Sequence, residues 1–522
     1  MKRHWAILLF LLGSGAVFLV FLFDRGFIAK GRQELQVSAK SDDVLTAYLH
    51  HPPKVLRVRQ DGLLLRGPFP AVSDLKAAGE GAYSGKGNRV YIRSMSGLPA
   101  EFTFEELHEV PDWCQGVFSI LAAVGMMGML AQGAGMAASP PAGQKMRPLD
   151  GLRGCACIVV VCFHFCIAFL LREPLHAEDM KALLKPFPYG ILVPGSFCVQ
   201  VFFVLSGFVL SLPFFRIEKE AFQAKLRSAF IRRPFRLLGV MLPVLVLAHL
   251  LGYGPQADPF TVTLDLITSP FAHAVNYVTP LWTLKTELYG SLGLFVCLWL
   301  LLGARRVWHV CFYASALVLL RGTDYLGFVM GAAFAEATAM GTLPLRGRVF
   351  VWLTSAGVVV SLWLAAFSQE LLLKRGLDNA VLDALNGWFP LSVVEASCLV
   401  FGTLHLVRLQ QFLTLKPIQF LGHISYSLYA IHWLVLYSIA VPFALWLEKQ
   451  RGWEAGVAWS LAGLVCLVSV IVLAWLVTLG IDTPAIRWSR RIADCVLERE
   501  RARESTHNME ALGETAASRM PS

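Results

Sequence analysis

Charged residues are scarce in this sequence. Asp, Glu, Lys and Arg make up 16% of its 522 residues, and hydrophobic residues make up 56%. Soluble domains carry about 25% charged residues, so the composition excludes an ordinary soluble globular protein. Apolar runs of about 20 residues recur along the chain, and each is long enough to cross the ~30 Å hydrocarbon core of a bilayer. The sequence therefore predicts an all-α integral membrane protein with many spans.

Several motifs that carry chemistry are also missing. The 11 cysteines include no CxxC pair and no zinc-site spacing, and most lie within apolar runs, where we expect them to be small buried residues. No GxSxG nucleophile elbow occurs. No internal repeat suggests an inverted-repeat transporter. The sequence thus predicts no metal site, no permanently bound cofactor and no serine-hydrolase centre.

The net charge of +10 does not indicate a nucleic-acid partner. The basic residues cluster between apolar runs, in every second loop, as the positive-inside rule describes. The opposite loop 254–278 contains no Lys or Arg. This alternation predicts a multi-pass protein of the plasma membrane, the inner membrane of a bacterium, with both termini in the cytoplasm.

Twelve apolar runs define the predicted organisation. The N-terminal module, 1–136, has an uncleaved anchor helix at 5–23, an extracytoplasmic segment at 24–112 and a second span at 113–136. A Pro- and Gly-containing linker follows at 137–146, then a ten-span domain at 147–485 and a polar cytoplasmic tail at 486–522. The ten spans lie near 150–171, 194–215, 236–253, 279–302, 307–320, 324–340, 349–367, 388–407, 418–446 and 456–480.

The extracytoplasmic segment has the pattern of a small folded domain, either α/β or β-rich. Val55–Arg59 and Leu63–Arg66 flank a Gln-Asp-Gly turn, which predicts a β-hairpin. Arg89–Arg93 is predicted to be another strand, and Phe104–His108 a short helix. A partner, such as a polysaccharide synthesis or export complex, could bind this domain.

Two ionisable residues share the first span of the ten-span domain. Arg153 and His164 are eleven residues apart, almost three helical turns, so both lie on one face about 17 Å apart along the axis. Ionisable groups in a membrane are costly, which makes each a functional candidate. An anionic cosubstrate held by Arg153 could present its reactive end to His164. The alternative is that His164 is a buried histidine bonded to a backbone carbonyl.

Glu287 is the second candidate for a catalytic residue. Counted from the start of its helix near residue 279, it lies ~12 Å below the outer surface, and His164 lies at ~13 Å if the core is ~30 Å thick. A carboxylate at that depth could orient the His164 imidazole or activate an acceptor hydroxyl. The alternative is a structural ion pair, for example with Lys285.

Two further groups are polar. The basic loop that contains Arg232, Arg233 and Arg236 could bind phosphates, although ordinary positive-inside charge explains it as well. The span from His423 to His432 carries hydroxyl groups that either line a tunnel or bond neighbouring helices. The residues that we expect to line a tunnel or to bind the acceptor are Asp150, Ser206, Trp282, Ser425, Tyr426, Tyr429 and His432.

Together these segments resemble membrane-bound acyltransferase family 3. The resemblance covers about 147–485 and is carried, in the family's order, by Arg147-Pro-Leu-Asp-Gly-Leu-Arg153 with His164, Phe202–Leu210, Arg232–Arg236, Leu281–Glu287, Tyr325–Gly331 and Gly422–His432. One departure is that the additional domain precedes the ten spans here, whereas many members carry it after them. The resemblance therefore leaves the acceptor open.

The resemblance implies a ten-helix O-acyltransferase. Such enzymes take an acetyl or other short acyl group from cytoplasmic acyl-CoA and transfer it to an extracytoplasmic carbohydrate hydroxyl of lipopolysaccharide, peptidoglycan, exopolysaccharide or a glycoconjugate. The family's essential histidine matches His164, and its RxxR motif, which is associated with CoA phosphates, matches Arg233 and Arg236. A donor-binding role for Arg153 and a catalytic role for Glu287 complete the expected site.

Two other classes of function fit the sequence less well. A proton-coupled transporter or flippase of a lipid-linked glycan could use the histidine and the carboxylate as a proton relay. A membrane scaffold could bind a partner through 24–112. Hydrolysis of acyl-CoA by the purified protein would distinguish the enzyme from both.

Overall fold

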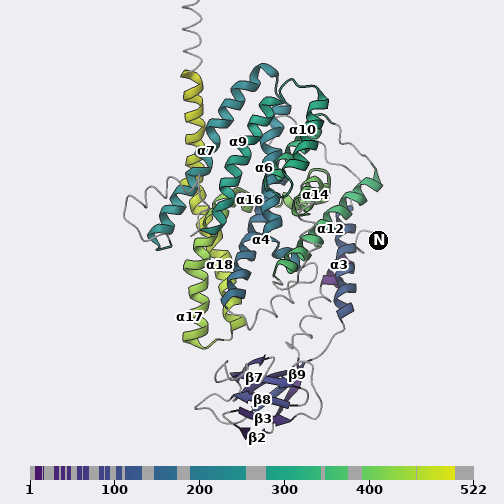
Figure 1. Cartoon of the computed structure of the whole chain (residues 1–522), viewed down its shortest axis with the longest axis vertical. Helices are drawn as coiled ribbons and strands as arrows, with labels where there is room; N and C mark the ends of the chain where they lie inside the picture. The colour runs from purple at the N-terminus through teal and green to yellow at the C-terminus, as the bar shows by residue number, and fades with distance from the viewer. Residues whose placement is uncertain are drawn as a thin grey trace, which may run out of the picture. The chain divides into compact units, whose positions relative to one another are not determined.

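The computed structural model describes helices and strands in two compact units of the chain (Figure 1). The described residues are 6–14, 16, 29–34, 37–41, 44–48, 56–60, 63–69, 82–86, 89–93, 102–107, 112–131, 146–172, 189–253, 278–341, 347–373, 391–453 and 455–499. The first unit comprises Met1–Met129 with Phe169–Gly190, and the second comprises Leu130–Ala168 with Ile191–Ser522. Residues 137–145 of the predicted linker and residues 500–522 of the predicted tail lie outside the described residues.

The first unit contains two sheets. One has the strand order β1 (Ala29–Glu34), β9 (Phe102–Leu107), β4 (Leu56–Gln60) and β5 (Leu63–Leu64). The other has the order β2 (Val37–Ser41), β3 (Val44–Tyr48), β8 (Arg89–Arg93), β7 (Ala82–Lys86) and β6 (Arg66–Phe69), in which only β6 and β7 pair in parallel among the described strands.

The strand pairing tests three of the predictions for this segment. β4 pairs antiparallel with β5, and β8 is a strand, so the hairpin and the strand at Arg89–Arg93 are confirmed. The helix predicted at Phe104–His108 is wrong, because Phe104–Leu107 belong to β9, which pairs with β1 and β4 on its two sides, and His108 lies outside the described residues. Two ladders of hydrogen bonds outweigh the helix preference of Glu105, Glu106 and Leu107.

Two helices complete the described part of this unit. Residues 6–14 are helical and pack on α3 (Asp112–Ala131), where Gly13 lies so close to Ala122 that a Cβ on the glycine would be 2.5 Å from the backbone nitrogen of Ala122. Small residues permit such close approach of helices in membranes.

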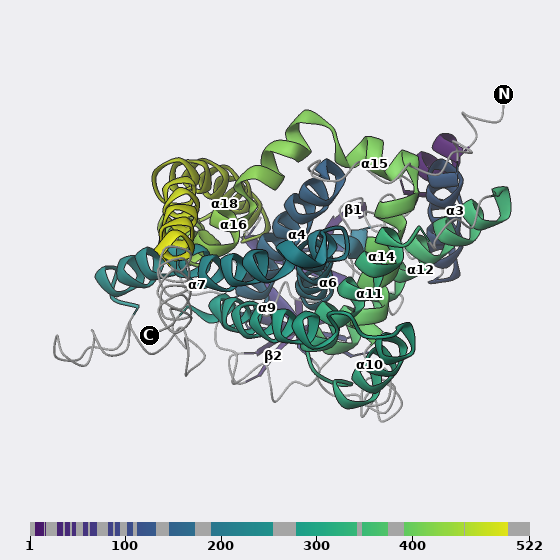
Figure 2. The same cartoon turned by 90° about the horizontal axis from the view of Figure 1, so that it is seen from above.

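The second unit is a bundle of helices (Figures 1 and 2). Its helices are α4 (Arg147–Arg172), α6 (Gly195–Phe215), α7 (Lys219–Leu250), α9 (Trp282–Leu300), α10 (Arg306–Leu319), α11 (Tyr325–Ala339), α12 (Arg348–Leu373), α14 (Leu391–His405), α15 (Val407–Leu413), α16 (Lys416–Val435), α17 (Val441–Arg451) and α18 (Ala455–Val477). π-Helical turns at Leu436–Ala440 and Thr478–Asp482 continue α16 into α17 and α18 into a helix that reaches Arg499.

Five of the described helical segments are long and apolar enough to cross a membrane. They are Arg147–Phe169, Gly195–Phe215, Arg348–Ala366, Lys416–Arg451 and Ala455–Arg499, and shorter apolar helices lie at Val117–Ala131, Arg306–Leu319, Tyr325–Ala339 and Leu391–His405. These helices and the composition identify an integral membrane protein. The count of twelve spans stays a prediction.

The basic loop predicted before residue 236 is instead part of α7. The helix begins at Lys219 and contains Arg232, Arg233 and Arg236, because most residues of its first four turns are Lys, Glu, Ala, Gln, Leu or Arg, which favour a helix. Pro234 lies inside the helix without ending it. The consequence for function is that a rigid helix, and not a loop, positions these guanidinium groups.

A short glycine contact fixes the register of α4 against α16. A Cβ on Gly154 would lie 2.5 Å from the backbone nitrogen of Gly422, so the two backbones nearly touch. Three residues further along each helix, Cys157 Sγ donates to the backbone oxygen of Ser425 at 3.1 Å. In both contacts the residue of α16 follows its partner in α4 by 268 positions in the sequence.

The third contact of this register brings together two histidines. His164 and His432 lie ten residues beyond Gly154 and Gly422. Ten residues of helix rise by ~15 Å, so two helices that start from one contact and run in the same direction carry both histidines to the same height. Their rings meet there, with centroids 5.0 Å apart.

Candidate active site

A cavity of about 550 Å³ lies among α4, α6, α7, α9 and α16. Its charged lining consists of five basic residues and two acidic ones: Arg153, Arg216, Lys225, Arg233, Arg236, Asp150 and Glu287. Low-dielectric walls strengthen the potential of such a predominantly positive cluster. The cavity is therefore suited to an anionic ligand.

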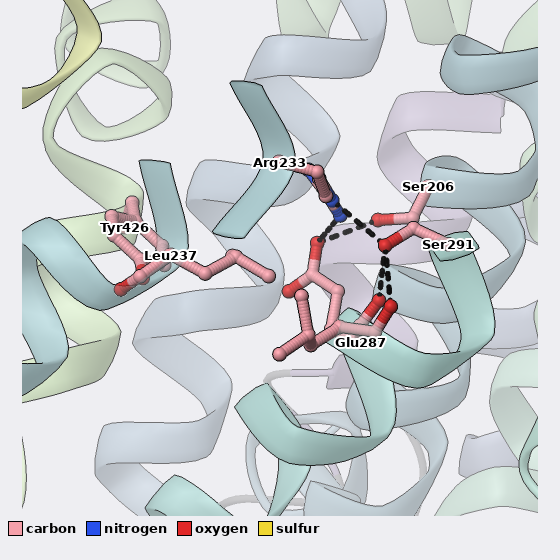
Figure 3. A network of polar contacts seen from close by, with 7 residues as sticks. Ser206, Arg233, Leu237, Glu287, Ser291 and Tyr426 are labelled. Carbon is pink, nitrogen blue, oxygen red and sulfur yellow. Dashed lines mark hydrogen bonds and ion pairs between the residues drawn. The ribbon is translucent and has the colours of Figure 1, made fainter. Parts of the chain in front are cut away.

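A buried ion pair lies in the wall of this cavity (Figure 3). Arg233 Nη2 donates to Glu287 Oε1 at 2.6 Å, and Arg233 Nε donates to Ser291 Oγ at 3.0 Å. Ser206 Oγ donates to the same Glu287 oxygen at 3.0 Å. Arg233 is 8% exposed. Its charge is thus largely balanced within the protein.

The expected pairing of Glu287 with His164 is not what the structure shows. No hydrogen bond joins the two residues in the described part of the chain, and Glu287 binds Arg233 and Ser206 instead. The helix arithmetic gave the depth of Glu287 but not the direction of its side chain, and a buried carboxylate pairs with the nearest guanidinium. The ion pair that the sequence offered as an alternative is present, with Arg233 and not Lys285 as the partner.

His164 is bonded to α4 itself and to α16. Its Nδ1 lies 2.9 Å from the backbone oxygen of Val160 and 3.3 Å from Nε2 of His432. The rings of Phe163 and Trp433 pack edge-on against it, with centroids 5.2 and 5.7 Å away. The backbone carbonyl that the sequence offered as an alternative partner is therefore present, together with a second histidine.

The histidine pair lies beyond the lined end of the cavity: His432 is one helical turn past Tyr429 on α16, and His164 is two turns past Cys157 on α4. Cys157 and Tyr429 line the cavity, and each lies on the helix of one histidine. His432 Nδ1 is 2.6 Å from the backbone oxygen of Tyr429. The hydroxyl groups of Tyr429 and Thr283 lie 2.8 Å apart and border the same end of the cavity.

The structure brings together most of the residues predicted for the site. The predicted residues that line the cavity are Asp150, Arg153, Ser206, Arg233, Arg236, Glu287, Ser425, Tyr426 and Tyr429. His164 and His432 are not part of that lining but contact one another beyond it. Trp282 is 36% exposed at the first residue of α9 and lies outside the lining of this cavity, so its role in lining a tunnel or binding the acceptor stays a prediction.

Several site residues were absent from the predicted set. Ser291 was missed although it follows Glu287 by four residues and so faces the same side of α9, where its hydroxyl accepts from Arg233. Arg216 and Lys225 carried a signal, since both lie in the basic stretch between spans. Thr283 carried no signal that distinguishes it from a hydroxyl bonded to its own helix.

Comparison with known proteins gives one match. The family model of an acyltransferase domain, acyltransferase family 3, matches residues 147–479, which is more than half of the chain. Neither the curated proteins nor the solved structures include a match to this chain.

Proposed function

The chain belongs to acyltransferase family 3 and is a membrane acyltransferase, and from this premise we propose that it transfers a short acyl group, an acetyl group in the simplest case, from cytoplasmic acyl-CoA to a hydroxyl of an extracytoplasmic carbohydrate. The observation that carries this proposal is the basic cavity that ends beside a histidine pair. The glycan would belong to an exopolysaccharide, a lipopolysaccharide or a glycoconjugate.

The basic residues of the cavity are the proposed site for the phosphates of the donor. They lie on α4, α6 and α7 near the ends that the loop charges assign to the cytoplasm. Arg233 is already held by Glu287, whereas neither Arg153 nor Arg236 forms an ion pair with a described residue. Arg153 and Arg236 are therefore the better candidates for direct phosphate contacts, and Arg233 shapes the wall beside them.

The acyl arm of the donor would extend from these phosphates along α4 toward the histidine pair. Nδ1 of His164 faces the carbonyl oxygen of Val160, which can only accept a hydrogen bond, so Nδ1 carries the proton. The lone pair of a neutral ring then lies on Nε2. That nitrogen is the atom that can react.

Two routes follow from a free lone pair on His164 Nε2. In the first, Nε2 takes the proton of the acceptor hydroxyl as its oxygen attacks the thioester carbonyl; the C–S bond breaks and the CoA thiolate takes up the proton. In the second, Nε2 attacks the thioester carbonyl first, the C–S bond breaks and the CoA thiolate leaves an acyl group on Nε2. The hydroxyl oxygen then attacks this acyl group, the acyl–Nε2 bond breaks, and the hydroxyl proton passes to the thiolate. In both, the ester forms and CoA–SH leaves.

The donor contacts can be tested with kinetics. We expect Arg236→Gln to raise the KM for acetyl-CoA about tenfold or more, since a charge-assisted hydrogen bond is worth about 1.5–3 kcal/mol. Arg227→Gln is the matched control, because Arg227 lies on the same helix but outside the lining of this cavity. An unchanged KM in Arg236→Gln, with wild-type protein levels, would remove Arg236 from the donor site.

The orientation of the chain can be tested by chemical labelling. We expect an impermeant thiol reagent to label Ser73→Cys but not Ser228→Cys in intact cells, each introduced into a variant that lacks the native cysteines. Ser73 lies in the predicted extracytoplasmic segment, outside the described residues, and Ser228 lies on α7 among basic residues. The reverse labelling pattern would contradict the proposed inner-membrane topology with cytoplasmic termini.

The reaction itself is tested with a deletion strain. Surface glycans of the strain, with and without the restored gene, would be compared by mass spectrometry for acyl groups lost and regained. Purified protein in liposomes would be assayed in parallel for consumption of acetyl-CoA. A full set of acylated glycans in the deletion strain, together with no consumption of acetyl-CoA, would overturn the proposal.

A further inference from the structure

We propose that His432 is a positioning residue for His164: it accepts the Nδ1 proton of His164 and so holds that ring with its Nε2 lone pair available for the reaction. This inference rests on the proposed function, in which His164 is the reacting group. It assigns to His432 a role other than the tunnel-lining one expected from the sequence. The observations that carry it are three distances around the two rings.

The protonation of the His432 ring follows from its own helix. Nδ1 of His432 lies 2.6 Å from the backbone oxygen of Tyr429, and a carbonyl oxygen can only accept. Nδ1 of His432 is therefore the protonated nitrogen. His432 is 1% exposed, and no carboxylate among the described residues pairs with it. A buried unpaired charge is costly, so the ring is neutral and its Nε2 is an acceptor.

That acceptor faces Nδ1 of His164. The two nitrogens are 3.3 Å apart, and the carbonyl oxygen of Val160 is 2.9 Å from the same Nδ1. Both neighbours accept, so one N–H of His164 is shared between them. The carbonyl fixes which nitrogen carries the proton, and His432 adds a second point that limits rotation of the ring.

The surroundings of the pair fit a positioning role better than direct chemistry by His432. Both nitrogens of His432 already have partners, on Tyr429 and on His164. No hydrogen bond to Nε2 of His164 is found among the described residues. Of the two rings, His164 therefore has the unused lone pair, on Nε2, and His432 contacts the opposite nitrogen of that ring, Nδ1.

Two amide substitutions distinguish positioning from packing. In His432→Gln the amide oxygen reaches the place of Nε2 and can accept from His164. In His432→Asn the shorter amide can replace only Nδ1 and its bond to Tyr429. A role in packing alone would make the two variants similar, whereas the proposed role requires that Gln substitutes and Asn does not.

The experiment uses the full chain in inverted membrane vesicles of its own host, so that the native acceptor is present and labelled acetyl-CoA reaches the cytoplasmic face. We expect His432→Asn and His432→Leu to lower kcat about tenfold, the effect of one lost hydrogen bond, and His432→Gln to stay within about twofold of wild type. The KM for acetyl-CoA should be unchanged in all three. His423→Leu is the control, since this exposed histidine lies on the same helix.

The outcomes separate this inference from the proposed function. Wild-type kcat in His432→Asn and His432→Leu would overturn the positioning role while transfer itself still stands. A His432→Gln variant as slow as His432→Leu, or a change of KM that matches the change of kcat, would also overturn it. No incorporation of label by the wild-type chain would instead overturn the proposed function. Immunoblots of the vesicles correct each rate for the amount of inserted protein.

Discussion

Replacing His164 with alanine is expected to lower the rate of acyl transfer by about 10²- to 10⁴-fold, the usual loss when a general base is removed. A sugar hydroxyl is a poor nucleophile at neutral pH, and the ring of His164, which contacts the backbone oxygen of Val160 and the ring of His432, lies beyond the end of the basic cavity. An imidazole can both take up and release a proton, so the side chain is suited to proton transfer. The measurement is acylation of surface glycans in cells that carry the variant.

Two variants make this result specific. His423→Ala removes an exposed histidine from α16 and should leave acylation unchanged. Glu287→Gln should impair transfer less than His164→Ala, since Glu287 contacts Arg233 and not the reacting ring. If His164→Ala were present in the membrane at the wild-type level and retained more than about a tenth of the acylation, neither route through His164 could be correct.

The second large effect is expected in stability. Arg233→Met should lower the free energy of unfolding by about 3 kcal/mol, the lower part of the range for a buried pair that loses one partner. We take the lower part because the Glu287 side chain is 20% exposed, and water compensates some of its charge. The loss would be measured as a lower midpoint of thermal aggregation in detergent.

The double variant Arg233→Met, Glu287→Leu provides the control for that effect. It removes both charges, and apolar replacements of a buried pair are often neutral, so the midpoint should recover most of its wild-type value. Acyl transfer should remain impaired, because the wall of the donor cavity has changed. A single variant as stable as the wild type would show that Glu287 is solvated or protonated in the folded protein.

The sequence predicted which segments meet better than it predicted how they meet. Helical rise placed His164 and Glu287 at a common depth, but rise says nothing about which neighbour a side chain faces, and Arg233 is the neighbour of Glu287. Likewise, the polar stripe of α16 was recognised, yet the contact of His432 with His164 depends on a register set ten residues earlier by Gly154 and Gly422. No local pattern reveals that register.

Two predictions of local conformation were wrong. In one, long-range strand pairing outweighed the helix propensity of the segment, and in the other, helix propensity decided the structure of a segment that the charge pattern had marked as a loop. Glu105 and Glu106 favour a helix in isolation, but their strand, β9, pairs with β1 on one side and with β4 on the other. The stretch before Arg236 was predicted to be a loop because basic residues mark the ends of spans, while its composition also favours the helix that the structure shows. The charge pattern was the basis for predicting the side of the membrane, and it carries no information about the conformation of the stretch.

The common offset of 268 residues between α4 and α16 limits how the chain can change in length. A residue inserted between Gly154 and His164 alone would turn the ring by about 100° and raise it by ~1.5 Å, enough to separate two nitrogens that are 3.3 Å apart. The same holds for the interval from Gly422 to His432. The interval of ten residues from the glycine contact to the histidine therefore has to be the same in α4 and in α16. Neither interval can gain or lose a residue unless the other does so as well. Among homologous chains we expect insertions and deletions to fall in the connecting segments and to spare both intervals.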